Sequence, residues 1–377
     1  MTAVALTQAN APRKVETFTQ LVWKRFKKHR LALISACILI ALVLVTLLAG
    51  VIESALGVSY HMTELGGRYG DYAWPHLLGT DDVGRDVLAR LLHGGRISLS
   101  VGVISAFSSA LIGTVIGLLA GFYGRWIDNV LMRFTDAMLS VPVLPLMIVF
   151  AALDLNKLFG GAKDWSSPIA FCAGIAVLVA AIRFFTGDRS ATKGGVGQYG
   201  IVDGLIVGAV CFVGYLIIFR FIDWEAVGTG NFSSVIKIIL IIVFFGWMTV
   251  ARLARAAALQ LKNMEFVTAA RALGAGDRRI LLVHILPNAM APIIVAATLE
   301  VGGNILYEAS LSFLGLGIQP PVPSWGNMLT NALDYIKRDP LLAFWPGLFI
   351  LVTVACFNFF GDGMRDALDP HQVMKEK

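Results

Sequence analysis

Long uncharged apolar runs are the feature that most constrains how this chain of 377 residues can fold. A helix rises 1.5 Å per residue, so about 20 apolar residues are needed to cross about 30 Å of hydrocarbon. The first run begins only after residue 30 and contains no charge, so we expect a permanent span and not a cleaved signal peptide. The pattern predicts an all-α polytopic bundle of about eight transmembrane spans: Leu31–Gly50, Ile97–Gly121, Met132–Leu153, Trp165–Ile182, Gly204–Phe219, Ile238–Ala251, Ala289–Phe313 and Leu341–Gly361.

Composition excludes several classes of protein. Hydrophobic residues make up 57% of the chain and charged residues 15%, against roughly 45–50% and 25% in soluble domains. The six histidines and four cysteines show no metal-ligand or disulfide spacing, so we expect no metal site. The net charge of +6 comes from basic residues beside apolar runs, which indicates membrane topology and not nucleic-acid binding.

The basic residues also predict an orientation. Cytoplasmic loops of membrane proteins are enriched in lysine and arginine. With the N-terminus inside and eight alternating spans, the larger share of the 31 Lys and Arg residues falls on the cytoplasmic side. We therefore expect a multi-pass protein with both termini in the cytoplasm.

A basic, helix-forming segment, Glu265 to Asn288, interrupts the apolar runs on the predicted cytoplasmic side. Asn263 is the expected N-cap, and Gly274 is expected to end the first helix. A second short helix is predicted from Asp277 to near Pro287. Two interpretations remain: an amphipathic connector lying at the lipid headgroups, or a helix that docks on a soluble partner protein. The glycine corner and its small neighbours favour docking.

Three stretches carry a resemblance to a known family. The first stretch is the basic segment from Glu265 to Asn288. It resembles the E-A-A-x3-G-x9-I-x-L-P loop signature of binding-protein-dependent ABC importer permeases, although Thr268 and His284 replace the Glu and Ile of that signature. The second, HLLGTDDVGRDVLARLLHGGRISL at 76–99, and the third, EASLSFLGLGIQPPVPSWGNML at 308–329, resemble the dipeptide, oligopeptide and nickel branch, C-type subunit. The resemblance implies a permease of a prokaryotic cytoplasmic (inner) membrane with the type I importer fold.

The resemblance also implies partners. Such an importer contains a companion permease in a heterodimer, two cytoplasmic ABC ATPases that bind ATP and Mg²⁺, and an external solute-binding protein. This chain has no GxxxxGK[ST] phosphate loop, so we expect no nucleotide cofactor and no enzymatic activity of its own. The resemblance assigns ATPase coupling to one set of residues: Glu265, Phe266, Thr268, Ala269, Ala270, Arg271, Gly274, Ala275 and Gly276.

Several alternatives stay open. Di- or oligopeptides are the favoured substrates, but nickel complexes, glutathione and oligosaccharides are also taken by this branch. An ion-coupled secondary transporter would need its own coupling site, often on broken helices in repeated halves, and would leave the basic loop unexplained. A membrane-embedded enzyme would need a reactive constellation such as paired acids, and we find none in the sequence.

Two further patterns lie within the predicted spans. Small residues recur at every fourth position of the second span and predict a close helix-packing face: Ser105, Ser109, Gly113, Gly117 and Gly121. Ionisable residues inside a membrane are costly and often functional. Glu300, Asn304 and Glu308 are therefore candidates for the translocation path, with structural pairing as the alternative. Outside the spans, we expect Asp81 and Arg85 to form a weak pair on an interfacial helix.

The predicted organisation has five parts. Compared with the six spans usual in the family, about two are added, and we interpret 154–237 as an inserted transmembrane hairpin. The predicted parts are a basic cytoplasmic N-terminus (1–30), the first three spans with an external loop (31–153), the hairpin (154–237), a permease core (238–370) with its cytoplasmic coupling loop (252–288), and a tail (371–377).

Overall fold

The computed structural model describes residues 18–63, 67–70, 72–153, 232–330 and 336–368. Within these ranges, every regular element is a helix. Five of the helical stretches are long and apolar enough to cross a membrane: Arg30–Leu47, Val87–Tyr123, Ser234–Leu261, Asp277–Phe313 and Leu341–Leu368. The all-α polytopic prediction is confirmed for this part of the chain.

The predicted third span is broken. Helix α6 (Arg125–Leu139) and helix α7 (Val143–Ala152) meet at 84°, and the pair counts as a sixth span only if it is taken as one bent unit. Pro142 stands as the N-cap of α7 and has no amide hydrogen to continue the hydrogen bonding of α6. The two remaining predicted spans, which make up the inserted hairpin, lie outside the described residues, so the number eight stays a prediction. Residues 232–237, assigned to the end of the hairpin, are described and begin helix α11 (Phe232–Leu261).

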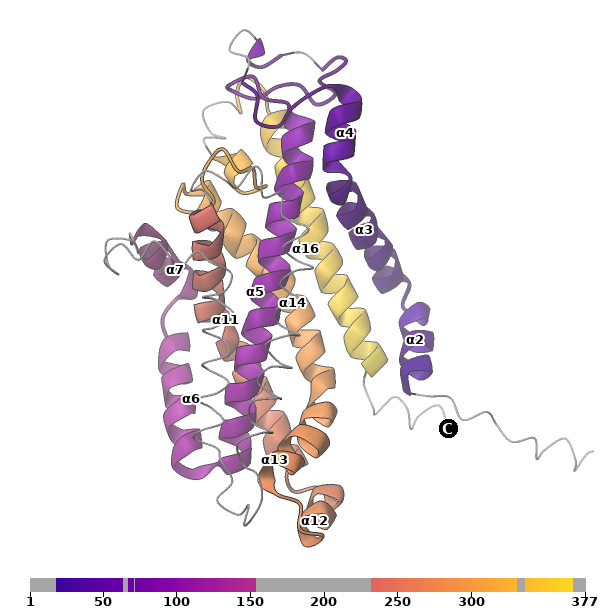
Figure 1. Cartoon of the computed structure of the whole chain (residues 1–377), viewed down its shortest axis with the longest axis vertical. Helices are drawn as coiled ribbons and strands as arrows, with labels where there is room; N and C mark the ends of the chain where they lie inside the picture. The colour runs from indigo at the N-terminus through magenta and orange to yellow at the C-terminus, as the bar shows by residue number, and fades with distance from the viewer. Residues whose placement is uncertain (1–17, 64–66, 71, 154–231, 331–335, 369–377) are drawn as a thin grey trace, which may run out of the picture.

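Helix α5 (Val87–Tyr123) is the central element of the bundle (Figure 1). It packs along helix α11 (Phe232–Leu261) and helix α14 (Leu286–Phe313). Helix α16 (Leu341–Leu368) lies against α14 and against helix α3 (Arg30–Leu47). The main core lies between α5 and α11 and includes the fully buried Ile238, Ile242 and Met248.

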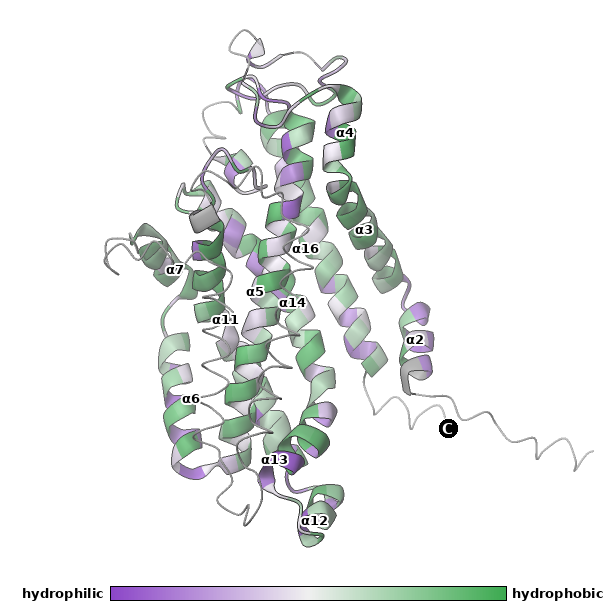
Figure 2. Cartoon of the chain, viewed as in Figure 1, coloured by the Kyte–Doolittle hydropathy of each residue, from purple (hydrophilic) through white to green (hydrophobic). Residues whose placement is uncertain are grey.

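Helix α3 is apolar almost all round and lies at the edge of the bundle (Figure 2). Leu31, Ile40 and Leu44 are each more than half exposed. A soluble protein rarely leaves such a contiguous apolar surface open, whereas hydrocarbon makes it favourable. The outer surface of α3 therefore faces lipid.

The two ends of the bundle carry different structures (Figure 1). One end holds helix α4 (Ala49–Leu56), the turns before α5 and the loop after α14 with its short 3₁₀ helix η4 (Asn327–Leu329). The opposite end holds helix α12 (Glu265–Ala272) and helix α13 (Asp277–Arg279), and helix α2 (Phe18–Lys28) packs beside the end of α16. We call these the outer end and the inner end, after the orientation that the basic residues predict.

Candidate coupling surface and buried polar sites

Helix α12 projects from the inner end of the bundle (Figure 1). Val267 is fully buried and packs with Ile280 and Ile285. On the other side of α12, Phe266 is 41% exposed and Leu273 is 88% exposed. The Phe266 ring lies 6.5 Å from that of His284, so Leu273 is the most exposed apolar side chain of this short helix and its end.

The turn after α12 follows from a glycine. Gly274 has φ +84°, a left-handed conformation that residues with a Cβ rarely adopt. The amide of Ala275 then donates to the carbonyl of Ala270 at 3.0 Å and closes the helix end. The predicted end of the first helix at Gly274 agrees with this geometry.

Two other predicted boundaries, the start of the first helix and the end of the second, differ from the structure. The N-cap is Met264 and not Asn263, because the Met264 carbonyl accepts the amides of Val267 and Thr268 at 3.0 and 3.1 Å. The second helix does not stop near Pro287. A π-helix, η3 (Ile280–Ile285), runs directly into α14, in which Pro287 is the second residue. Proline has no amide hydrogen to donate to the preceding turn, and the wider π-helical turn lies directly before it. The chain therefore rises from α13 into the membrane without a break.

The residues expected to couple to an ATPase lie together on this inner projection. Glu265, Thr268, Ala269 and Arg271 are exposed on α12, and Ala270 is half-buried. In the corner after α12, Gly274 and Gly276 are exposed and Ala275 is half-buried. The surface that they form with Phe266 and Leu273 is called the α12 surface below.

The small-residue face of α5 lies against α11. A Cβ on Gly113 or Gly117 would overlap the backbone of α11 at Trp247 or Ala251. A Cβ on Gly121 would lie 2.7 Å from that of Ala258. Ser105 and Ser109 continue this face and are fully buried, and Ser109 lies opposite Gly246. Helices α5 and α11 can approach so closely because the glycines on this face of α5 have no side chains.

The three candidate translocation residues on α14 do not share one environment. Glu308 is fully buried and accepts hydrogen bonds from Ser98 of α5 at 3.0 Å and from Ser312 at 2.8 Å. Ser98 in turn accepts the amide of Trp325, in the loop after α14, at 3.1 Å. Glu308 thus joins α14, α5 and the outer loop, which is the structural pairing that the sequence left as the alternative.

Glu300 and Asn304, one helical turn apart, have a different environment. Among the described residues, neither Glu300 Oε2 nor Asn304 Nδ2 has a hydrogen-bond partner, although both atoms are buried. The hydroxyls of Ser105 and Ser109 are also buried and unpartnered among the described residues, but they lie on the face of α5 that packs against α11. Buried polar groups in native proteins almost always find partners, so Glu300 and Asn304 mark a place on α14 where another group is expected to contribute.

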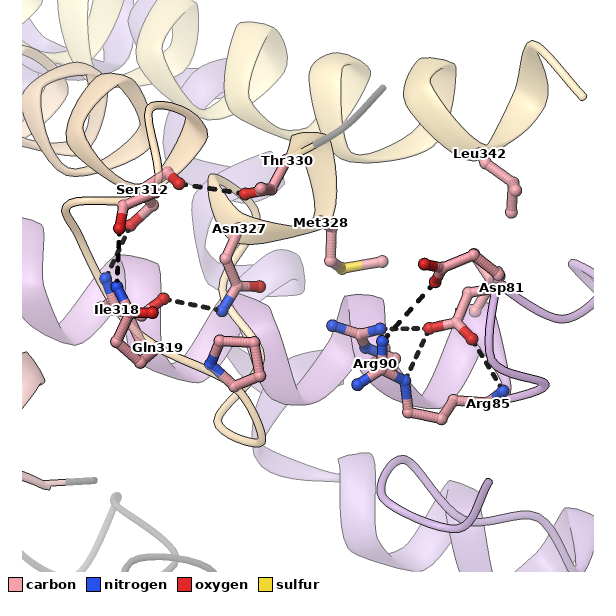
Figure 3. A pocket seen from close by; sticks show the side chains of 14 residues that line it. Asp81, Arg85, Arg90, Ser312, Ile318, Gln319, Asn327, Met328, Thr330 and Leu342 are labelled. Carbon is pink, nitrogen blue, oxygen red and sulfur yellow. Dashed lines mark hydrogen bonds and ion pairs between the residues drawn. The ribbon is translucent and has the colours of Figure 1, made fainter. Parts of the chain in front are cut away.

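A cavity at the outer end was missed by sequence reasoning (Figure 3). It measures about 170 Å³ and lies between the start of α5 and the loop after α14. Asp81 forms the expected pair with Arg85 at 2.7 Å, but it also pairs with Arg90 of α5. The expected interfacial helix is wrong: residues 73–86 form turns, and α5 begins after Asp86, which caps it through the amide of Ala89 at 2.7 Å. The nine-residue separation of Asp81 and Arg90 follows no helical or strand spacing, so the pattern gave no signal.

Several apolar helices, the close packing of α5 on α11 and the exposed helix α12 define a multi-pass membrane protein. Comparison with known families is specific. Residues 113–373 match the model described as the binding-protein-dependent transport system inner membrane component, and residues 17–60 match the N-terminal transmembrane domain of oligopeptide transport permease C. The chain belongs to this family of binding-protein-dependent permeases, within its peptide branch.

Relatives match over nearly the whole chain. A dipeptide transport system permease protein of Alkalihalophilus pseudofirmus is 31% identical over 368 residues, which cover 96% of this chain and 95% of the relative. An oligopeptide transport system permease protein of Bacillus subtilis is 31% identical, with 97% and 95% covered. A glutathione transport system permease protein of Escherichia coli is 32% identical, with 95% and 92% covered. All three are named as permease components of larger transport systems.

Proposed function

We propose that this chain is the permease subunit of an ATP-driven importer and that the α12 surface docks on a separate ATPase subunit. The observation that carries the proposal is the exposure of Leu273 and Phe266 on a short helix whose one fully buried side chain is Val267. A helix that fits its apolar side chains into a groove of a partner is a common recognition mode. Docking would remove these side chains from water. It would also allow movement of the partner to be transmitted to α14, because α13 and η3 continue into α14.

The other parts of the proposed assembly follow from the family. A companion permease would complete a heterodimer, two ATPases would supply the ATP and Mg²⁺ sites, and an external solute-binding protein would meet the outer end. In this arrangement both termini lie in the cytoplasm, because α2 and the end of α16 lie toward the inner end (Figure 1). The five basic residues at 24, 25, 27, 28 and 30 support the same orientation.

Short peptides are the proposed substrates. Relatives named for dipeptides, oligopeptides and glutathione each match most of this chain. Glu300 and Asn304 are the proposed lining of the translocation path, since both have buried atoms without partners. Glu308 is assigned to holding the outer end, because its carboxylate is already bonded to Ser98 and Ser312.

The docking proposal is tested with Leu273→Glu in the assembled transporter. A charge at this position would have to be buried on docking, so we expect loss of ATPase co-purification and of ATP-driven uptake. Leu77→Glu is the matched control, because Leu77 is 47% exposed at the outer end. Unchanged co-purification and uptake in Leu273→Glu would refute the assignment of the α12 surface.

A further inference from the structure

The cavity at the outer end has two unlike walls (Figure 3). One wall is charged and comes from the turn before α5 and from α5 itself, with Asp81, Asp82, Arg85 and Arg90. The other wall comes from the loop after α14 and includes Gln319, Asn327 and Thr330. Met328 and Leu342 add an apolar side.

The charged wall carries more positive than negative charge in its buried part. The side chains of Arg85 and Arg90 are 16% and 7% exposed, and both pair with the single carboxylate of Asp81, which is 12% exposed. Asp82 does not restore the balance, because its side chain is 45% exposed and lies 3.8 Å from Arg85. Two buried guanidinium groups therefore share one buried carboxylate.

The hydrogen bonds of this wall also leave the arginines short of an acceptor. A carboxylate accepts about four hydrogen bonds. Asp81 already accepts from the amides of Val83 and Arg85 at 3.0 and 2.9 Å, from Arg85 Nε at 2.7 Å and from Arg90 Nη1. Arg90 Nε is buried and has no partner among the described residues. The acceptor capacity of Asp81 is used up while a buried guanidinium still has donors to satisfy.

The opposite wall does not supply the missing acceptor. Asn327 donates to the carbonyls of Ile318 and Val322 at 3.2 and 2.7 Å and accepts from the amide of Ser324 at 3.0 Å. Gln319 donates to the carbonyl of Gly315 at 2.9 Å. These groups hold the loop in shape and leave the guanidinium of Arg90 facing the cavity (Figure 3).

We propose that this cavity binds a carboxylate that arrives from the outer side. Two buried guanidinium groups on one buried carboxylate favour an anionic acceptor as the missing partner, and a planar carboxylate matches the fork of a guanidinium group. Two sources have this chemistry: the terminal carboxylate of a short peptide, and an acidic side chain of the external binding protein. The inference rests on the proposed function, which places both on this side of the membrane.

The experiment uses the assembled transporter purified in detergent. Trialanine is titrated while thermal unfolding is followed, beside N-acetyl-trialanine, which keeps the carboxylate, and trialanine amide, which lacks it. Met328→Trp fills the cavity from its apolar side without removing a charged group. Met62→Trp is the matched control, because Met62 is 65% exposed in the outer turns and does not line the cavity. Asp82→Asn removes the nearby competing negative charge.

If the carboxylate belongs to the peptide, trialanine and its acetyl form raise the unfolding temperature and the amide does not. Met328→Trp abolishes the shift, Met62→Trp keeps it, and Asp82→Asn tightens binding about two- to fivefold. If it belongs to the binding protein, free peptides have no effect, and Met328→Trp but not Met62→Trp weakens docking of that protein. The proposal would be overturned if trialanine amide raised the unfolding temperature as much as trialanine does. It would also be overturned if Met328→Trp changed neither the peptide-induced shift nor docking of the binding protein. Failure of the ATPase to co-purify with the wild-type complex would instead count against the proposed function.

Discussion

The outer and inner ends of this bundle are built in opposite ways. At the outer end, Glu308, Ser98 and Trp325 form a buried hydrogen-bonded connection between α14, α5 and the loop, and Asp81 accepts bonds from Val83, Arg85 and Arg90. At the inner end, α12 is fixed by Val267 and exposes Leu273 to solvent. The difference supports the proposal that a partner completes the inner end, whereas contacts within this chain shape the outer loop.

The largest loss of unfolding free energy is expected from Asp81→Asn. Asp81→Asn leaves two buried guanidinium groups without their common counterion, and breaking a buried pair in this way costs about 3–5 kcal/mol of unfolding free energy. Thermal or denaturant unfolding of the detergent-solubilised protein measures it. A loss below about 1 kcal/mol would mean that the outer end is not held by this cluster.

The same variant gives a prediction about pH. Burial alone would raise the pKa of the Asp81 carboxyl, but Arg90, the bond from the Arg85 amide and the Arg85 charge together hold it below its ordinary value. A lowered folded-state pKa means that the contribution of Asp81 is complete above the unfolded pKa, about 4. The stability gap between wild type and Asp81→Asn should stay constant from pH 7 to 5 and narrow only as pH falls through the folded pKa. A gap that closes between pH 7 and 5 would contradict this assignment.

Glu308→Ala is expected to have the next largest effect. It removes two hydrogen bonds from buried hydroxyls and loosens the link to Trp325, for a loss of about 3 kcal/mol. Unfolding temperature measures the loss, and protease cleavage within 314–330 reports release of the loop. Glu308→Gln keeps one acceptor and should recover part of the stability. Equal behaviour of the Ala and Gln variants would show that these bonds do not hold the loop.

Gly117→Ala tests the close packing of α5 on α11, which lies between the two ends. A methyl group there would overlap the carbonyl of Ala251 on α11, so we expect about 1–3 kcal/mol of destabilisation. Gly50→Ala is the control, because a Cβ at Gly50 meets no atom within 4 Å. If both substitutions are neutral, α5 and α11 do not pack as closely as described.

The smallest effect on stability is expected at the inner end. Leu273→Glu replaces a side chain that is 88% exposed, so the unfolding free energy of the isolated subunit should change by less than about 0.5 kcal/mol. A large loss would show that α12 is held by contacts within this chain, and the contrast between the two ends would disappear.

Sequence patterns predicted those parts of the fold that depend on local spacing. Apolar run length located the spans, and Gly274 marked the end of α12 because a positive φ at a helix end is a local property. Pro142 predicts a bend in the third span, as the structure has it, but not its angle of 84°. The continuation of the helix through Pro287 was not predicted, because proline is compatible with a bend, a stop or a first turn. Ser98 and Glu308 are 210 residues apart, so only the packing of α5 on α14 reveals their bond.

The central claim is that the α12 surface contacts an ATPase subunit, and cross-linking from Leu273→Cys tests it most directly. The variant is made in a background without the four native cysteines and treated with a short thiol-to-amine cross-linker in membranes that contain the complete transporter. The account predicts a cross-link to the ATPase from Leu273→Cys and none from Leu77→Cys at the outer end. A cross-link to the ATPase from Leu77→Cys, or modification of Leu273→Cys without any ATPase product, would contradict it.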